Sequence, residues 1–527
     1  MSLATSPKAA LSRRSFLGAG VVAPALPRSG GRPNILWICT DQQRFDTIEA
    51  LGNPHIRTPN LDRLAASGVA FANVYCQSPI CTPSRASFLT GCYPSTIHDN
   101  RNGGAWFPPE SVRRLISRIL AGTGYDCGLA GKLHLASCQN RPEPRVDDGY
   151  RMFKWSHQPM PSPAWPPGTE AYQDWLRGQG VDWAKEFGAR KLSGWPDAYQ
   201  AGISAKYDQT TWCAEEAMAF LREPRKTPWL MSVNPFSPHP VFPAQTREQQ
   251  RLAEQRKNLT HPPPRFFAAP EYLERMKPEQ MPLPVFQPSD LDTFHQLGGV
   301  DHQTTTPLQP AEYPARHMKA AYYASVELID AQVGRLLDTL DETGQRDNTI
   351  VVFHSDHGEM LGDHGLVGKG CRFYEGAVHV PLLVSWPARF RRGVICDALV
   401  ELTDIVPTLL ESVGLPQPEY VQGRSLVPYL TGGAPDRPRR FVRCEYYDAI
   451  RMPRASRANM LFDGRWKLVV YHGQGLGELY DLKEDPGEFH NRWAEPAARQ
   501  VKADLIARLL DDLALSADPG PPRIASF

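Results

Sequence analysis

The segment from Cys81 to Gly91 contains a cysteine at the start of a predicted short helix. It reads Cys-Thr-Pro-Ser-Arg-Ala-Ser-Phe-Leu-Thr-Gly; Pro83 suits the first helical turn, and Gly91 suits the residue just after the last. Because the N-terminus of a helix stabilises negative charge, a nucleophile at Cys81 could attack an anionic ester. A structural buried cysteine would fit the same residues, so this segment alone leaves both interpretations open.

Two pairs of possible metal ligands follow apolar runs elsewhere in the chain. Asp41 and Gln42 form the first pair, and Asp356 and His357 form the second. Carboxylate and amide oxygens suit a hard divalent cation such as calcium, whereas the histidine also admits manganese or magnesium. A single Asp-His pair is more often an ordinary strand-to-loop turn. The placement of both pairs after predicted strands favours the metal interpretation.

The elements that would position these residues are buried strands alternating with helices. Three apolar runs, Asn34–Thr40, Trp229–Val233 and Thr349–Ser355, have the composition of buried strands. Apolar residues recur at helical spacing from Lys319 to Glu342, and Gly344 ends that helix. This alternation predicts a layered α/β domain. In such sheets the functional site lies beyond the carboxyl ends of the strands, where both polar pairs are found.

The alternation of strand and helix patterns is weaker between residues 150 and 316, where proline-rich stretches surround a helix expected from Ser204 to Leu221. We predict that this insert shapes a substrate pocket, because loops of this length are usually functional or disordered. Five tryptophans crowd its first half, and they could bind sugars or simply fasten loops to the core; the second interpretation is favoured. These tryptophans are Trp155, Trp165, Trp175, Trp183 and Trp195.

The last part of the chain, residues 435–527, predicts a small C-terminal subdomain. Short apolar runs at Phe441–Glu445, Trp466–Tyr471 and Glu478–Leu482 suggest an antiparallel sheet, followed by a helix from Pro496 to Leu513. The predicted organisation is therefore a leader over residues 1–30, a catalytic domain over 31–434 and this subdomain.

Composition and the N-terminus restrict the cellular context. The 58 lysines and arginines nearly cancel the 57 acidic residues, which argues against nucleic acid or an anionic membrane surface as partner. Ser12–Leu17, with Arg13 and Arg14, looks like a twin-arginine signal, and the apolar run behind it is too short to span a bilayer. We therefore expect export by the twin-arginine machinery to the periplasm or outside, with no stable membrane insertion.

The ten cysteines form no Cys-x-x-Cys metal pattern, so most of them are interpreted as small core residues. A disulfide between two of them stays open for an exported protein.

The chain resembles the type I, formylglycine-dependent sulfatases of the alkaline phosphatase superfamily. The resemblance rests on Cys-x-Pro-Ser-Arg followed by Leu-Thr-Gly, and it covers residues 32–131, 349–387 and 466–491; Cys92 stands where the family usually has arginine. It implies an alkaline-phosphatase-like α/β domain with a large, mixed, mainly parallel sheet flanked by helices, plus a smaller C-terminal α+β domain with an antiparallel sheet. It also implies hydrolysis of a sulfate ester of a glycan or aryl alcohol.

The same resemblance implies site residues and cofactors. The metal ligands would be Asp41, Gln42, Cys81, Asp356 and His357, and the catalytic residues Cys81, Arg85, Lys132, His134, His239 and Lys369. The cofactors would be one divalent cation, Ca²⁺ first with Mn²⁺ or Mg²⁺ as alternatives, and formylglycine made from Cys81 by a sulfatase-modifying enzyme. Asp356 is expected to accept the proton of the nucleophile.

Two rival functions remain. The Asp-Gln and Asp-His pairs at Gln42 and His357 also occur in phosphonate monoester hydrolases, whereas many sulfatases have Asp-Asp and Asp-Asn there. A phosphonate monoester or phosphodiester hydrolase is therefore the first alternative. The second is a catalytically silent exported protein that binds sulfated glycans through the tryptophan-rich insert.

Overall fold

The computed structural model describes residues 31–139, 141–162, 164–241, 266–297, 300, 309–450 and 456–517. The predicted export signal lies outside the described residues and stays a prediction. None of the helices in these ranges has the length and apolar character needed to cross a membrane.

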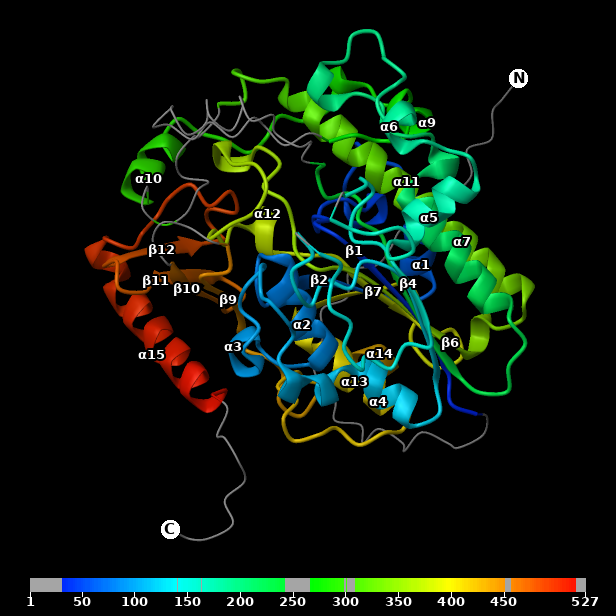
Figure 1. Ribbon diagram of the computed structural model, residues 1–527. Helices are drawn as coiled ribbons and strands as arrows, with labels where there is room; N and C mark the ends of the chain where they lie inside the picture. The colour runs from blue at the N-terminus through cyan, green and yellow to red at the C-terminus, as the bar shows by residue number, and fades with distance from the viewer. Residues whose placement is uncertain are drawn as a thin grey trace, which may run out of the picture.

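Within these ranges, eight strands form one mixed sheet at the centre of the molecule (Figure 1). Their order is β4-β3-β5-β1-β6-β7-β2-β8. Neighbouring strands are parallel except β7, which is antiparallel to both β6 and β2. The strands are β1 (Asn34–Thr40), β2 (Val69–Tyr75), β3 (Asp126–Gly131), β4 (Met152–Trp155), β5 (Trp229–Asn234), β6 (Thr349–Ser355), β7 (Leu382–Ser385) and β8 (Val394–Glu401). The three strands expected from the sequence are confirmed as β1, β5 and β6, which are adjacent.

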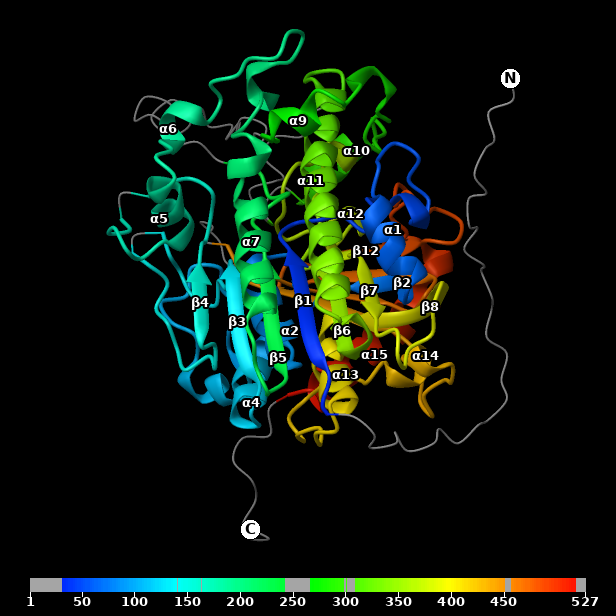
Figure 2. The same ribbon diagram turned by 90° about the vertical axis from the view of Figure 1, so that its right-hand side faces the viewer.

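Helices cover both faces of this sheet, as Figure 2 shows from the side of α7 and α11. One face is covered by α1 (Pro59–Ala66), α7 (Gln209–Arg222) and α11 (Ala315–Glu342), and the other by α2 (Cys81–Thr90), α4 (Ile116–Gly122) and α13 (Ile405–Ser412). Strand β1 serves both layers, because Ile35 and Trp37 point into one core and Leu36 and Ile38 into the other. The layered α/β prediction is confirmed.

In the described ranges, the other helices before the C-terminal domain are short. They are α3 (Pro94–Ile97), α5 (Ala171–Gly178), α6 (Trp183–Glu186), α9 (Pro270–Leu273), α10 (Asp290–Leu297), α12 (Glu375–Val378) and α14 (Val427–Thr431).

Two helix predictions differ from the structure at their starts. Helix α11 begins at Ala315, four residues before the expected Lys319, and ends at Glu342 as predicted. The single helix expected from Ser204 is instead a 3₁₀ turn over Ala205–Tyr207 followed by α7. The break has a local cause: Asp208 adopts an extended backbone, and its carboxylate accepts a hydrogen bond from the Thr210 N–H, which makes it the cap of a new helix.

The C-terminal domain is built on a four-stranded antiparallel sheet, and its final helix is α15 (Arg499–Leu515), preceded by a 3₁₀ turn at Pro496–Ala498. Its strands are β9 (Val442–Tyr447), β10 (Arg457–Phe462), β11 (Trp466–Tyr471) and β12 (Leu476–Asp481). The sequence did not predict β10, because a buried polar residue, Asn459, interrupts its apolar pattern; Tyr447 Oη donates to the Asn459 side chain at 2.9 Å.

The two domains share a core. One face of the small sheet packs on α15. Met460 and Val469 on its strands instead belong to the same hydrophobic core as α2, α4 and α13, on one face of the large sheet. The fold class is therefore confirmed, while the boundary between residues 434 and 435 stays a prediction.

All ten cysteines are buried, and none of them is in a disulfide. Their interpretation as core residues is confirmed, and the structure contains no disulfide among them.

Candidate active site

The carboxyl ends of four adjacent parallel strands carry most of the predicted site residues. These are Lys132 and His134 after β3, His239 after β5, Asp41 and Gln42 after β1, and Asp356 and His357 after β6. Cys81 is the first residue of α2, and Gly91 ends that helix in the left-handed conformation, with a φ of 72°. The sheet edge and the start of α2 therefore meet at one place, as expected for an α/β site.

The Cys81 sulfur is the centre of this cluster. Its Sγ lies 2.6 Å from Lys369 Nζ, 3.2 Å from His357 Nε2 and 3.6 Å from both Lys132 Nζ and Asp41 Oδ1. Burial opposes ionisation of the thiol, but Lys132, Lys369 and His357 outweigh it and hold the pKa of Cys81 well below its usual range. Position 81 is therefore built to carry a nucleophile or an anion.

A possible metal site lies beside this sulfur. One ligand atom from each of Asp41, Cys81, Asp356 and His357 can be chosen so that all four lie within 4.8 Å of one another, and all four residues are buried. His357 Nδ1 donates to the Gly358 carbonyl at 2.9 Å, so Nε2 is the ring nitrogen that faces Cys81 and the possible metal site. The donor set of two carboxylates and an imidazole fits a divalent cation.

Gln42 completes the possible metal site. Its Oε1 atom is buried without a hydrogen-bond partner among the described residues, as expected for an oxygen that faces an ion. Its backbone φ is 70°, and its Nε2 donates to Glu359 Oε2. Glu359 therefore orients the amide so that Oε1 faces the site. Sequence reasoning missed Glu359; its place two residues after His357 was the available signal.

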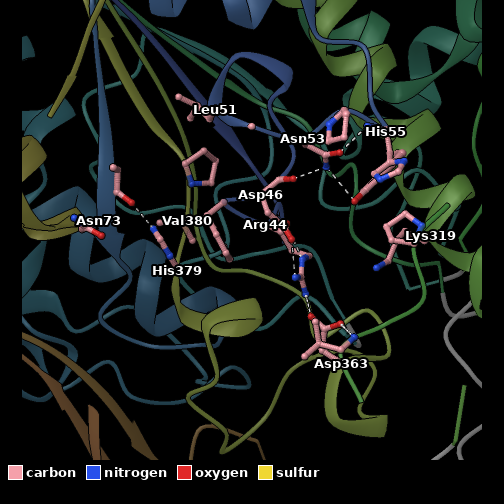
Figure 3. Close-up of a pocket in the computed structure, with 18 of the residues that line it drawn as sticks. Arg44, Asp46, Leu51, Asn53, His55, Asn73, Lys319, Asp363, His379 and Val380 are labelled. Atoms are coloured by element: carbon pink, nitrogen blue, oxygen red, sulfur yellow. Dashed lines mark hydrogen bonds and ion pairs between the residues drawn. The ribbon is translucent and has the colours of Figure 1, made fainter. Parts of the chain in front are cut away.

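An arginine supports this loop from behind. Arg44 Nη1 lies 2.7 Å from Asp363 Oδ2 and donates to the Glu359 carbonyl at 2.9 Å. Figure 3 shows Arg44 pointing to Asp363 in the wall of a second pocket, of about 560 Å³, whose lining residues do not include Cys81. The ion pair thus fastens the segment after β1 to the segment after β6.

The expected proton acceptor, Asp356, is already engaged. Its Oδ2 accepts from Arg85 Nε at 2.8 Å, and its Oδ1 accepts from the backbone N–H groups of Gln42 and His357 at 2.9 Å each. Asp41 Oδ1 lies 3.6 Å from the Cys81 sulfur. Burial and the negative charge of Cys81 favour a higher pKa for Asp41, but the charge of Lys132 outweighs them and lowers this pKa to about 2. Because Asp41 Oδ1 lies within 3.6 Å of Cys81 Sγ, Asp41 is a second candidate for that proton beside the expected Asp356.

His239 and Lys369 form a hydrogen-bonded pair at the mouth of the site. Lys369 Nζ lies 3.2 Å from His239 Nε2, while His239 Nδ1 donates to the Pro240 carbonyl at 2.8 Å. Burial, followed by the charge of Lys369, lowers the pKa of His239. The imidazole is therefore neutral, and its Nε2 is turned toward the lysine and the cavity.

His134 lies on a strained turn held by a carboxylate that the sequence did not reveal. Its φ is 59°, and Glu143 accepts hydrogen bonds from the backbone N–H groups of His134 at 2.9 Å, Leu135 at 2.5 Å and Ala136 at 3.2 Å, and from the Trp155 indole at 2.9 Å. Burial, followed by Lys132, lowers the pKa of His134 to about 4. Glu143 thus presents a neutral His134 to the cavity.

Replacing Glu143 with glutamine should therefore impair the site as well as stability. Each carboxylate oxygen of Glu143 accepts hydrogen bonds from two N–H groups. In Glu143→Gln an amide NH₂ replaces one oxygen, so two of the four donors lose their acceptor. Each unsatisfied donor lowers the free energy of unfolding by roughly 1–3 kcal/mol. We expect kcat to fall by roughly 10- to 100-fold, because misplaced catalytic groups lose rate steeply. Urea unfolding and initial rates would measure both effects.

Glu170→Gln is the matched control for this prediction. Glu170 is also a buried carboxylate, but it accepts from Gln173 N at the start of α5. Its replacement should lower stability while kcat stays within about twofold. Equal losses of kcat in the two variants would contradict a special role for Glu143.

A cavity of about 450 Å³ opens above the cluster. Its walls combine catalytic candidates and Asn102 with side chains from the insert, including His157, Gln158, Trp165 and Phe236. Trp165 Nε1 donates to the Cys138 carbonyl at 2.9 Å and its ring packs on Trp155, so these two tryptophans mainly fasten loops, as favoured. Trp165 also lines the cavity, so for this residue the sugar-binding interpretation stays open.

A buried carboxyl near this cavity should make stability depend on pH. Asp99 is 4% exposed, and burial, followed by Glu143, raises its pKa to about 8. Between pH 4 and pH 8 the Asp99 carboxyl is therefore protonated in the native state and ionised in the unfolded chain, where its pKa is near 4. The free energy of unfolding falls as pH rises through this range, because the unfolded state releases a proton that the native state keeps. Asp99→Asn should raise the melting temperature at pH 8 and hardly change it at pH 4, as thermal unfolding can measure. The exposed Asp147→Asn is the control; an equal gain from Asp99→Asn at both pH values would refute the assignment.

Comparison with known proteins connects this geometry to a family. Residues 33–415 match the profile of the sulfatase family, and residues 362–514 match that of the C-terminal region of N-sulphoglucosamine sulphohydrolase. The chain is 29% identical to the multifunctional alkaline phosphatase superfamily protein PehA of Trinickia caryophylli, over 91% of this chain and 95% of that protein. An arylsulfatase of Clostridium perfringens is 28% identical, over 87% of this chain and 90% of that protein.

A solved structure shares the fold. The phosphonate monoester hydrolase SpPMH from Silicibacter pomeroyi superposes with a TM-score of 0.76 at 24% identity, over 93% of this chain and 96% of that chain. Because the family profile spans most of the chain and named sulfatases align along nearly its whole length, the protein is an enzyme of the sulfatase family, within the alkaline phosphatase-like superfamily.

Proposed function

We propose that the protein hydrolyses a sulfate monoester, of a glycan or aryl alcohol, through formylglycine made from Cys81 and with one divalent cation. The observation that carries the proposal is the convergence of two lysines on one sulfur, with Lys369 Nζ at 2.6 Å and Lys132 Nζ at 3.6 Å from Cys81 Sγ. Preorganised cations of this kind stabilise the negative charge that develops on transferred sulfate oxygens.

The proposed cofactors fit the residues around position 81. Asp41, Gln42, Asp356 and His357 would hold the cation, with Ca²⁺ first and Mn²⁺ or Mg²⁺ as alternatives, and it would add positive charge beside the sulfate. Formylglycine would present two hydroxyl groups on one carbon, one to attack sulfur and one to release sulfate. A sulfatase-modifying enzyme and twin-arginine export complete the proposal.

The chain's own residues then move the protons. Asp41 receives the proton of the attacking hydroxyl, since its Oδ1 lies 3.6 Å from the Cys81 sulfur. When the bond from sulfur to the ester oxygen breaks, Lys369 and His239 deliver a proton to the departing alcohol across their 3.2 Å contact. The neutral His134 accepts the proton of the second hydroxyl; the bond from carbon to the sulfated oxygen breaks, the carbonyl group re-forms and sulfate leaves. Water then restores the hydrate.

A phosphonate monoester hydrolase is the second candidate, favoured by the side chains of Gln42 and His357 in the possible metal site. The deciding experiment compares kcat/KM for 4-nitrophenyl sulfate and for a phenyl phosphonate ester with the purified, modified enzyme. Preferred turnover of the sulfate supports the proposal, and dominant phosphonate hydrolysis overturns it.

Mass spectrometry of the Cys81 peptide tests the nucleophile itself. Coexpression with a competent modifying enzyme should convert the thiol to an aldehyde, with the matching loss of mass. A peptide left wholly as cysteine, together with absent turnover, would favour a binding protein instead.

A further inference from the structure

Three side chains that can bind a metal, two imidazoles and one thiol, form a second cluster in the wall of the cavity. One ligand atom from each of His134, Cys138 and His157 lies within 4.8 Å of the other two, and all three residues line the cavity that contains Cys81. The fold explains the juxtaposition, because β3 and β4 are parallel neighbours paired at Gly131 and Trp155. His134 and Cys138 follow the first strand, and His157 follows the second.

The two imidazoles of this cluster lack hydrogen bonds that buried rings normally make. Nδ1 of His134 and Nδ1 of His157 are both buried without a partner among the described residues. The two rings stand edge to face, with their centroids 4.4 Å apart. Buried polar atoms without partners call for an explanation, and an ion is one.

We propose that His134, Cys138 and His157 form a second metal site, which takes a borderline-soft divalent cation of the zinc type and inhibits the enzyme. Two imidazoles and a thiolate are ligands that Zn²⁺ prefers, and a fourth position would open to the cavity. The first site offers mainly oxygen ligands, which suit a hard cation instead. On binding, the Cys138 thiol loses its proton to solvent, and a sulfur–metal bond forms.

Inhibition follows from the identity of one ligand. His134 would give a nitrogen lone pair to the metal, and the bound ion would narrow the cavity above Cys81. This part rests on the proposed function, in which His134 accepts a proton during sulfate release. The binding of the metal itself does not depend on that function, so the two can be tested separately.

The binding test uses cobalt as a spectroscopic probe. The Cys81→Ser protein, which lacks the other thiol of the cavity, is saturated with Ca²⁺ and titrated with Co²⁺. We expect one equivalent to produce a thiolate-to-cobalt charge-transfer band, and Cys138→Ser in the same background to abolish it. Cys127→Ser, a buried thiol on β3 outside the cluster, should keep the band. Absence of the band, or its persistence without Cys138, overturns the proposal.

The inhibition test uses the modified, Ca²⁺-saturated enzyme. Buffered Zn²⁺ should reduce hydrolysis of 4-nitrophenyl sulfate, and chelation should restore it. With each variant compared to its own metal-free rate, Cys138→Ser should need at least about tenfold more Zn²⁺ for half inhibition, whereas Cys127→Ser should match the parent. Equal inhibition of all three proteins, or none, would refute an inhibitory role. If no sulfatase activity exists, only this test is lost, and the cobalt result still decides whether the site binds metal.

Discussion

Cys81→Ala is expected to reduce sulfate ester hydrolysis by roughly 10⁴-fold or more, the largest effect of any single substitution in this chain. The reason is that position 81 supplies the atoms that react, and no described side chain beside it can take over. Asp41, Lys132, His357 and Lys369 contact its sulfur, but each serves as a base, a cation or a ligand. Initial rates at saturating substrate would measure the loss.

The control for this substitution is Cys92→Ser. Cys92 follows the same helix and is also buried, but its thiol contacts the carbonyls of Thr90 at 3.7 Å and Tyr420 at 3.2 Å, which a serine hydroxyl can also contact. It should retain activity within about twofold, and both variants should unfold cooperatively in urea. Full-rate hydrolysis by Cys81→Ala would contradict the covalent mechanism.

Asp41→Asn is expected to lower kcat/KM by about 10³-fold, as the removal of strong electrostatic groups from active sites does. Asp41 is fully buried, pairs with Lys132 Nζ and lies 3.7 Å from Arg85 Nη2. Its loss removes a carboxylate from the possible metal site and a counter-charge from two buried cations. Breaking such a buried pair destabilises proteins by roughly 3–5 kcal/mol.

Three measurements separate the consequences of this change: bound cation by elemental analysis, kcat/KM, and urea unfolding. Asp46→Asn is the matched control, because Asp46 follows the same strand but pairs with Arg44 at 2.8 Å and has a side chain that is 36% exposed. It should keep its cation and its activity within about twofold. If Asp41→Asn binds as much cation and reacts as fast as the parent protein, Asp41 is not a metal ligand.

Much of the fold could be predicted because its signals are local. The strands β1 and β6 have the predicted bounds, since each is a continuous apolar run ended by a charged or polar residue. Helix α2 likewise begins at Cys81 and ends before Gly91, because proline and glycine mark those positions. Strand β10 escaped prediction because its buried Asn459 looks like a surface residue until its partners are known.

The candidate site was predictable in its central residues and not in their supports. Asp41, His134 and Lys369 could be named from strand ends and family motifs, and the structure brings them around Cys81. Glu143 and Glu359 could not, because a glutamate in a loop gives no sign of what it binds. Their roles depend on backbone groups and an amide brought near them by the fold.

The sequence by itself determined the family and the α/β class and supplied Cys81 as the proposed reacting position, because these depend on the order of residue types along the chain. Only the tertiary structure decided which carboxylate contacts the Cys81 sulfur, that burial lowers the pKa of His134 and of His239, and that His134, Cys138 and His157 share a wall of the cavity. The physical reason is distance. Cys81 and Lys369 are 288 residues apart in sequence and 2.6 Å apart in space, and charge, burial and ligand geometry act through space.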